Sequence, residues 1–155
     1  MTAPADVRAR RPKQHEALMI SLQQEANFPA FRDILLFAGA VGFAQDRRVP
    51  FTATAGDPIR YETLIIPAFA DALIGMIAAN VVDTDPEIMD SDRLHERVTI
   101  FEEYANGGLE YIQELVNTRK QPVALIVLDV MTSALTEENE STDIPVEDLL
   151  DGVTW

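Results

Sequence analysis

The sequence contains no cysteine. This absence excludes disulfide bonds and thiolate-bound zinc or iron–sulfur clusters, and it removes cysteine as a catalytic nucleophile. Basic residues are also scarce, because 12 Lys and Arg stand against 26 Asp and Glu and leave a formal net charge of −14 at pH 7. Such an excess of negative charge repels phosphate, so it argues against a protein that binds nucleic acid nonspecifically over its whole surface.

Long apolar runs are missing as well. The apolar stretch 72–82 is too short to span a bilayer, and the first 18 residues are charged where a signal peptide needs an apolar core. We therefore expect a cytoplasmic protein that has no membrane partner. Phosphate-binding glycine loops of the GxxxxGK[ST] and GxGxxG types are also absent, as are the GxSxG elbow of serine hydrolases and the HExxH zinc motif.

The charge that is present is unevenly distributed. Residues 1–60 carry eight Lys and Arg against six Asp and Glu, whereas residues 61–155 carry four against twenty. This asymmetry indicates two surfaces of different character, with a basic one near the start of the chain. At 155 residues with 47% hydrophobic content, the chain has enough apolar material for one core.

Apolar residues recur at helical spacing along most of the chain, which predicts an all-α single domain of about six helices. We expect a mobile basic arm over 1–11, a helical domain over 12–135, and an acidic tail over 136–155 with one short helical turn at Val146, Leu149 and Leu150. The expected helices cover 12–25, 31–45, 67–82, 92–106, 109–119 and 122–135.

Two segments between these helices are irregular. Residues 46–58 form a long loop with two prolines, a glycine and charges of both signs, and loops of this length are often functional. Asp57 and Pro58 fit the start of a helix, but the alternation over 59–62 also fits a short strand, and both interpretations stay open. Gly107 and Gly108 are expected to end one helix and allow a sharp turn into the next.

The acidic stretch 83–92 resembles a calcium loop in composition only. An EF-hand loop that started at Asp83 would need glycine at Ile88 and glutamate at Leu94, so the register fails. We interpret the stretch as a solvated turn in which Ser91 or Asp92 caps the following helix. His95 has no second histidine one helical turn away, and His15 is far from it in sequence, so we expect no metal site and no cofactor.

The basic residues are the remaining candidates for a binding surface. They are Arg8, Arg10, Arg11 and Lys13 in the N-terminal segment, with Arg47, Arg48 and Arg60 in and beside the long loop. They could contact DNA phosphates or a protein partner. For Arg47, Arg48 and Arg60, pairing with carboxylates of the same or a neighbouring subunit is favoured. The chain has 26 Asp and Glu residues, and arginine forms bidentate pairs with carboxylates.

Five segments together resemble a known family. They are FRDILLFAGAVGF (31–43), RRVPF (47–51), IRYETL (59–64), ALIGMIAA (72–79) and IFEEYANGGLEYIQE (100–114). In this order they are similar to small bacterial proteins associated with DNA phosphorothioation, or Dnd, systems. The most specific piece is FEEYANGGLE (101–110), which we call the 101–110 motif.

The resemblance implies an accessory role in a sulfur-based DNA modification and antiphage defence system. It supplies no catalytic residues, so the motif turn itself, Glu102, Glu103, Tyr104, Asn106, Gly107 and Gly108, is the only further candidate for binding. We expect a non-enzymatic adaptor that contacts other proteins of the modification or restriction system and that could form a homo-oligomer.

Three other functions remain open. The basic arm and the 46–60 loop could bind DNA directly if their side chains converge without carboxylate partners. A ridge of exposed carboxylates could instead mimic DNA. A metal-dependent nuclease would require acids from distant helices to meet around an ion.

Overall fold

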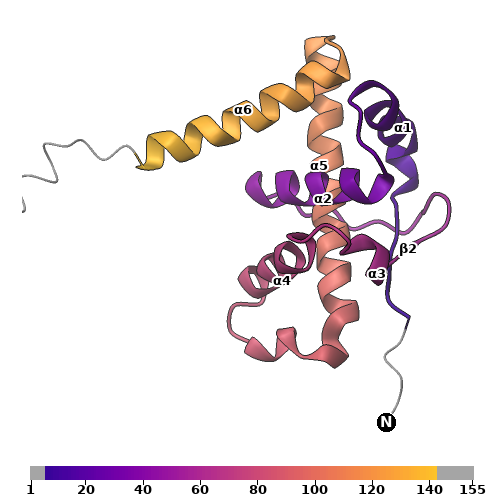
Figure 1. Cartoon of the computed structure of the whole chain (residues 1–155), viewed down its shortest axis with the longest axis vertical. Coiled ribbons are helices and arrows are strands. Elements are labelled where there is room, and N and C mark those ends of the chain that lie inside the picture. Colours follow the sequence, from indigo (N-terminus) through magenta and orange to yellow (C-terminus); the bar gives the residue numbers. More distant parts are fainter. Residues whose placement is uncertain (1–5, 143–155) are drawn as a thin grey trace, which may run out of the picture.

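A computed structural model describes residues 6–142 as α-helices grouped around one long helix, α5 (Figure 1). The predicted all-α class is confirmed, with one very small sheet added. The α-helices are α1 Glu16–Glu25, α2 Phe31–Ala44, α3 Tyr61–Leu64, α4 Ala70–Val81, α5 Leu94–Arg119 and α6 Val123–Thr142. The strands are β1 Arg8–Ala9 and β2 Ile59–Arg60, and the 3-10 helices are η1 Lys13–His15, η2 Pro86–Met89 and η3 Ser91–Arg93.

Helix α5 forms the centre of the core. In Figure 1 it runs along the long axis, α2 crosses its middle, α4 lies beside its first half, and α1 lies beside its second half. Phe101, Leu109 and Ile112 of α5 have no exposed surface. Burying each such side chain contributes roughly 1.5–3 kcal/mol relative to exposure, so α5 is the element on which the fold depends most.

The predicted helix break at Gly107 and Gly108 is wrong, because α5 continues through both residues to Arg119. The glycines serve the crossing with α2 instead. A Cβ atom on Gly108 would overlap the carbonyl oxygen of Ala38, and one on Gly42 would overlap the carbonyl oxygen of Tyr104. The two backbones therefore touch directly, and only glycine permits this approach. Local propensity favours a break here, but the packing gained at the crossing outweighs that cost of about 1 kcal/mol per glycine.

The segment 1–11, which is predicted to be a mobile arm, is paired with the rest of the chain over residues 7–11, and residues 1–5 lie outside the described part. Strand β1 pairs antiparallel with β2, and Val7 and Ala9 are buried. The ladder continues through hydrogen bonds from Lys13 N–H to the Ala53 carbonyl and from Ala55 N–H to the Arg11 carbonyl. Residues 7–13 therefore form a fixed layer with the second half of the 46–60 loop.

This pairing also decides between the two open interpretations of 57–62. Ile59 and Arg60 form the strand, and the four-residue helix α3 starts directly after them at Tyr61. The alternating pattern was the better guide, because a partner strand from the N-terminus was available.

Helix α6 is longer than predicted and ends at Thr142 rather than at 135. It contacts α1 and α5 at its start and then points away from the rest of the molecule (Figure 1). The turn predicted at Val146, Leu149 and Leu150 lies outside the described residues. In the described part, no helix is long and apolar enough to cross a membrane.

Helix α5 does not use the predicted caps. It begins at Leu94, and neither Ser91 nor Asp92 caps it because both belong to η3. A side-chain cap is found instead at η2, where the Asp85 carboxylate accepts a hydrogen bond from the Glu87 N–H. Arg93 then binds Asp85 at 2.6 Å, and this pair lowers the pKa of the Asp85 carboxyl.

Candidate functional site

Most of the predicted basic residues have carboxylate partners within the chain. The pairs are Arg8–Asp6 at 2.6 Å, Arg10–Glu102 at 3.0 Å, Arg47–Glu114 at 2.8 Å, Arg48–Glu103 at 2.8 Å and Arg60–Glu62 at 3.6 Å. The guanidinium of Arg11 lies over the ring of Phe31, 4.3 Å from its centroid. Lys13 is exposed and makes no ion pair with a described residue.

Two of these pairs join the basic residues to the 101–110 motif. Glu102 is only 3% exposed and accepts from both the backbone N–H of Arg10, at 2.5 Å, and its guanidinium. Burial raises the pKa of Glu102, although the bonds from Arg10 oppose that rise. At the next residue of α5, the Glu103 carbonyl accepts a hydrogen bond from Val49 N–H, which holds the start of the loop. The motif thus anchors the N-terminal segment and the 46–60 loop to α5.

Asn106 extends this anchor with a fully buried amide. Its Nδ2 donates to the Val49 carbonyl at 2.9 Å, and its Oδ1 accepts from Gln14 Nε2 at 3.1 Å. Gln14 Nε2 also lies 3.2 Å from His15 Nε2. Because an amide nitrogen can only donate, His15 Nε2 must accept, and the imidazole is therefore neutral.

This chain of bonds predicts a pH effect on stability. Burial lowers the pKa of His15 below its ordinary value of 6.5, and the Glu110 charge only partly opposes this. Below about pH 6.5 the unfolded chain takes up a proton at this residue that the folded chain resists, so the free energy of unfolding decreases as the pH falls. Denaturation curves between about pH 5 and 8 should show this decrease in the wild type and a smaller one in His15→Gln. An equal slope in both would contradict the assignment.

The other motif residues complete the packing. Tyr104 is 6% exposed and meets Phe43 of α2 edge to face, with ring centroids 5.7 Å apart. Gly107 lies against the Arg47 carbonyl, so it lets the loop start close to α5. The side chains of Glu102, Glu103 and Asn106 are therefore occupied by intramolecular bonds, and this arrangement favours a structural role for the motif.

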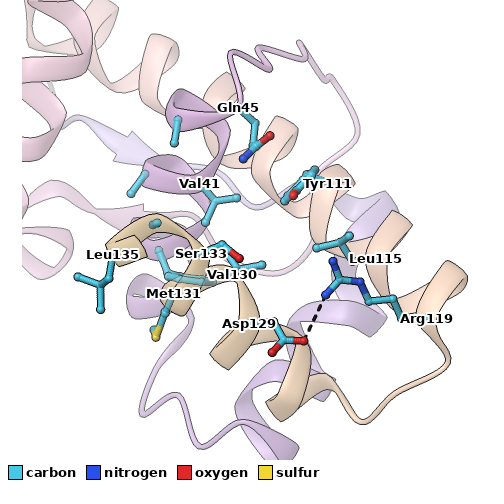
Figure 2. Close-up of a pocket in the computed structure, with 14 residues that line it drawn as sticks. Val41, Gln45, Tyr111, Leu115, Arg119, Asp129, Val130, Met131, Ser133 and Leu135 are labelled. Carbon is cyan, nitrogen blue, oxygen red and sulfur yellow. Dashed lines mark hydrogen bonds and ion pairs between the residues drawn. The ribbon is translucent and has the colours of Figure 1, made fainter. Parts of the chain in front are cut away.

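A second candidate site is an apolar groove of about 540 Å³ between α2, α5 and α6. Figure 2 shows Val41 on α2, Tyr111 and Leu115 on α5, and Val130 on α6 around this space. Its other lining residues are Phe37, Ala40, Ala44, Gln45, Arg119, Asp129, Met131, Ser133, Ala134 and Leu135. Arg119 and Asp129 bridge α5 and α6 at 3.2 Å beside the groove.

The groove exists because α6 leaves the body of the molecule. Val123, Ile126 and Val127 at its start are buried, but the helix then diverges from α2. Leu128, Met131 and Leu135 are 56%, 43% and 63% exposed. Apolar side chains thus cover more than the face that α6 needs for its own packing, a property typical of helices that bind another protein.

Sequence reasoning did not identify this groove. Apolar residues surround most of the helix predicted over 122–135, and this pattern favours a helix that is buried on all sides rather than one that lines a groove. The acidic residues from 137 onward were the available signal, since a helix with such an end cannot be buried along its whole length.

The acidic residues that the structure describes form no cluster suited to a metal ion. Within the described part of the chain, no three His, Asp or Glu side chains are placed to hold a metal ion.

The family model described as DNA sulphur modification system-associated protein 4 matches residues 8–149. The chain belongs to this family. No curated protein and no solved structure matches it.

Membership confirms the predicted association with a DNA sulfur modification system. The matched residues start at Arg8, the first residue of β1, and they include α6. Strand β1 of the anchored N-terminal segment and the projecting helix α6 thus both lie within the residues that the family model covers.

Proposed function

We propose that this member of the DNA sulphur modification system-associated protein 4 family is a non-enzymatic accessory subunit that acts through protein–protein contacts. The observation that supports this most is α6, which carries exposed Leu128, Met131 and Leu135 beside an open apolar groove. A partner that covers this surface would remove apolar area from water, at roughly 25 cal/mol per Å².

Direct DNA binding is the second candidate, and it has less support. Five of the seven candidate basic side chains already have a carboxylate partner, so binding phosphate would require breaking those pairs. Among the described residues, Arg11 and Lys13 have no carboxylate partner, so these two side chains are the best remaining candidates for a contact with phosphate. DNA mimicry is disfavoured in the region 85–96, because Arg93 neutralises Asp85 and Glu96 there.

A pull-down separates the first two candidates. Tagged full-length protein is recovered from a host that carries the modification system, at low and moderate salt, with and without nuclease. We expect proteins of the system to be recovered and to survive nuclease treatment. Recovery of nucleic acid alone, or loss of every partner after nuclease, would contradict the accessory role.

A charge-reversal pair tests DNA binding separately. Lys13 and Lys120 are both exposed but lie in different parts of the molecule. If DNA is contacted at the N-terminal edge, Lys13→Glu should weaken fluorescence anisotropy titrations and reduce the salt slope by about 1, whereas Lys120→Glu should not. We expect weak binding that both variants reduce to a similar extent, because each lowers the net charge equally.

A further inference from the structure

The groove between α2, α5 and α6 is apolar and opens in the direction in which α6 extends. Val41, Leu115 and Val130 give it an apolar wall on each of the three helices (Figure 2). Its two charged lining residues, Arg119 and Asp129, bind each other at 3.2 Å, so the pair carries no net charge. The occupant is therefore selected by apolar side chains and by its ability to reach the groove.

The chain itself continues past α6. Residues 143–155, which we call the C-terminal segment, follow directly after Thr142. About 10 Å of helix separates Thr142 from Leu135 at the groove. A segment of this length spans up to about 40 Å when extended, so it is long enough to turn back and lie along the groove.

The sequence of the C-terminal segment suits an apolar groove. Four apolar residues recur at spacings of three and four, which places them on one side of a helical turn: Val146, Leu149, Leu150 and Val153. The acids at 147, 148 and 151 fall on the opposite side. The segment can therefore offer the groove an apolar face and leave its charges in water.

From the apolar lining, the reach and this spacing we infer that the C-terminal segment docks in the groove of its own chain. A short tether gives it an effective concentration in the millimolar range, which favours it over a free partner. A return antiparallel to α6 puts Trp155 deepest in the groove, because it is the residue of the segment farthest from Thr142.

Docking would regulate access to the surface on which the proposed function depends. A protein that binds beside α6 must then displace the segment, which acts as an internal competitor. In this respect the inference rests on the proposed function. The docking itself is measured separately from any partner.

The fluorescence of Trp155 reports docking in the full-length protein, because it is the only tryptophan of the chain. The wild type should emit at shorter wavelength than the urea-unfolded chain. Ala134→Glu puts a carboxylate into the groove and should lower the ratio of docked to free segment at least about tenfold, since burying an unpaired charge is strongly unfavourable. Its emission should then match that of the unfolded chain.

Ala124→Glu is the matched control for this measurement. Ala124 is also exposed on α6, but it does not line the groove. The variant adds the same charge and should keep the emission of the wild type. Circular dichroism verifies that the helices are intact in both variants.

The absence of cysteine allows a second measurement by disulfide formation. Ser133 lines the groove, whereas its neighbour Thr132 is exposed and does not line it. On oxidation, the double variant Ser133→Cys with Thr154→Cys should close an intramolecular disulfide at least about tenfold faster than Thr132→Cys with Thr154→Cys. Both pairs have nearly the same tether length, so equal rates would show a segment that reaches the groove without docking and would overturn the inference.

Other results would also overturn it. Emission of the wild type equal to that of the unfolded chain would show that Trp155 is not docked. A blue shift that Ala134→Glu leaves unchanged would place the segment outside the groove. A blue shift that disappears on dilution, with covalent dimers of the Ser133→Cys double variant, would identify the segment of a second copy as the occupant.

The pull-down distinguishes failure of the inference from failure of the proposed function. Leu149→Asp in the full-length chain should weaken docking and increase the recovery of system proteins. Equal recovery by the wild type and Leu149→Asp would overturn the regulatory part of the inference and leave the accessory role standing. If neither recovers a system protein, the accessory role fails, and the emission of Trp155 alone decides whether the segment docks.

Discussion

Replacing Gly108 by alanine is expected to lower the free energy of unfolding by about 3 kcal/mol. The added methyl group would overlap the Ala38 carbonyl, which belongs to the backbone of α2 and cannot rotate away. The helices must then separate at a crossing that also buries Phe101 and Leu109. Chemical denaturation followed by circular dichroism measures the change.

Gly75→Ala is the matched control for this prediction. Gly75 is also inside a helix, but a methyl group there would meet only the Cε atom of Met89, at 2.9 Å, at the end of a flexible side chain. Alanine has a helix propensity up to about 1 kcal/mol better than glycine, which offsets the cost of moving Met89. We expect stability within about 1 kcal/mol of the wild type. Equal losses in the two variants would show that the α2–α5 crossing tolerates a larger separation.

Replacing Glu102 by alanine is expected to lower the free energy of unfolding by about 3 kcal/mol. The change leaves the Arg10 N–H without its acceptor and removes the partner of the Arg10 guanidinium. Because Arg10 is 42% exposed, water can solvate its side chain, so the loss belongs to the lower end of the range for buried pairs. Hydrogen exchange should show faster exchange at residues 7–13 before the rest of the chain is affected.

Glu102→Gln separates the hydrogen bonds from the charge. Glutamine keeps an oxygen that accepts from the Arg10 N–H, and it removes a carboxylate whose pKa is raised by burial. A raised pKa means that ionising Glu102 is less favourable in the folded chain than in the unfolded chain, so its contribution to stability decreases as the pH rises through that pKa. We therefore expect Glu102→Gln to cost less than about 1 kcal/mol at pH 7. A loss as large as that of Glu102→Ala would show that the negative charge itself holds Arg10.

At the centre of the fold, the sequence predicts which glycines matter but not what they do. The sequence marks Gly107 and Gly108 as unusual positions, but the turn predicted there is wrong, because the role of both glycines depends on residues from other parts of the chain. Nothing in the local sequence distinguishes a glycine that ends a helix from one that admits the backbone of α2. The difference lies in a contact with Ala38, which is 70 positions earlier in the chain.

The candidate site shows the same limit. Arg10 and Glu102 were each identified, in separate sets, as possible binding residues, and only the fold shows that they bind each other. The groove was not identified, because it is formed by helices from 31–44, 94–119 and 123–142, whose relative positions no local pattern encodes.

The sequence by itself determined the helical class, the approximate position of most helices, the separation of basic and acidic halves, and the family. These follow from periodicity, composition and short motifs, which are local properties. The tertiary structure decided that α5 is continuous, that the N-terminal segment is anchored to it, and that α6 extends away from α2 beside a groove. Each of these depends on contacts between distant residues, whose free energy outweighs the local preferences from which the predictions were made.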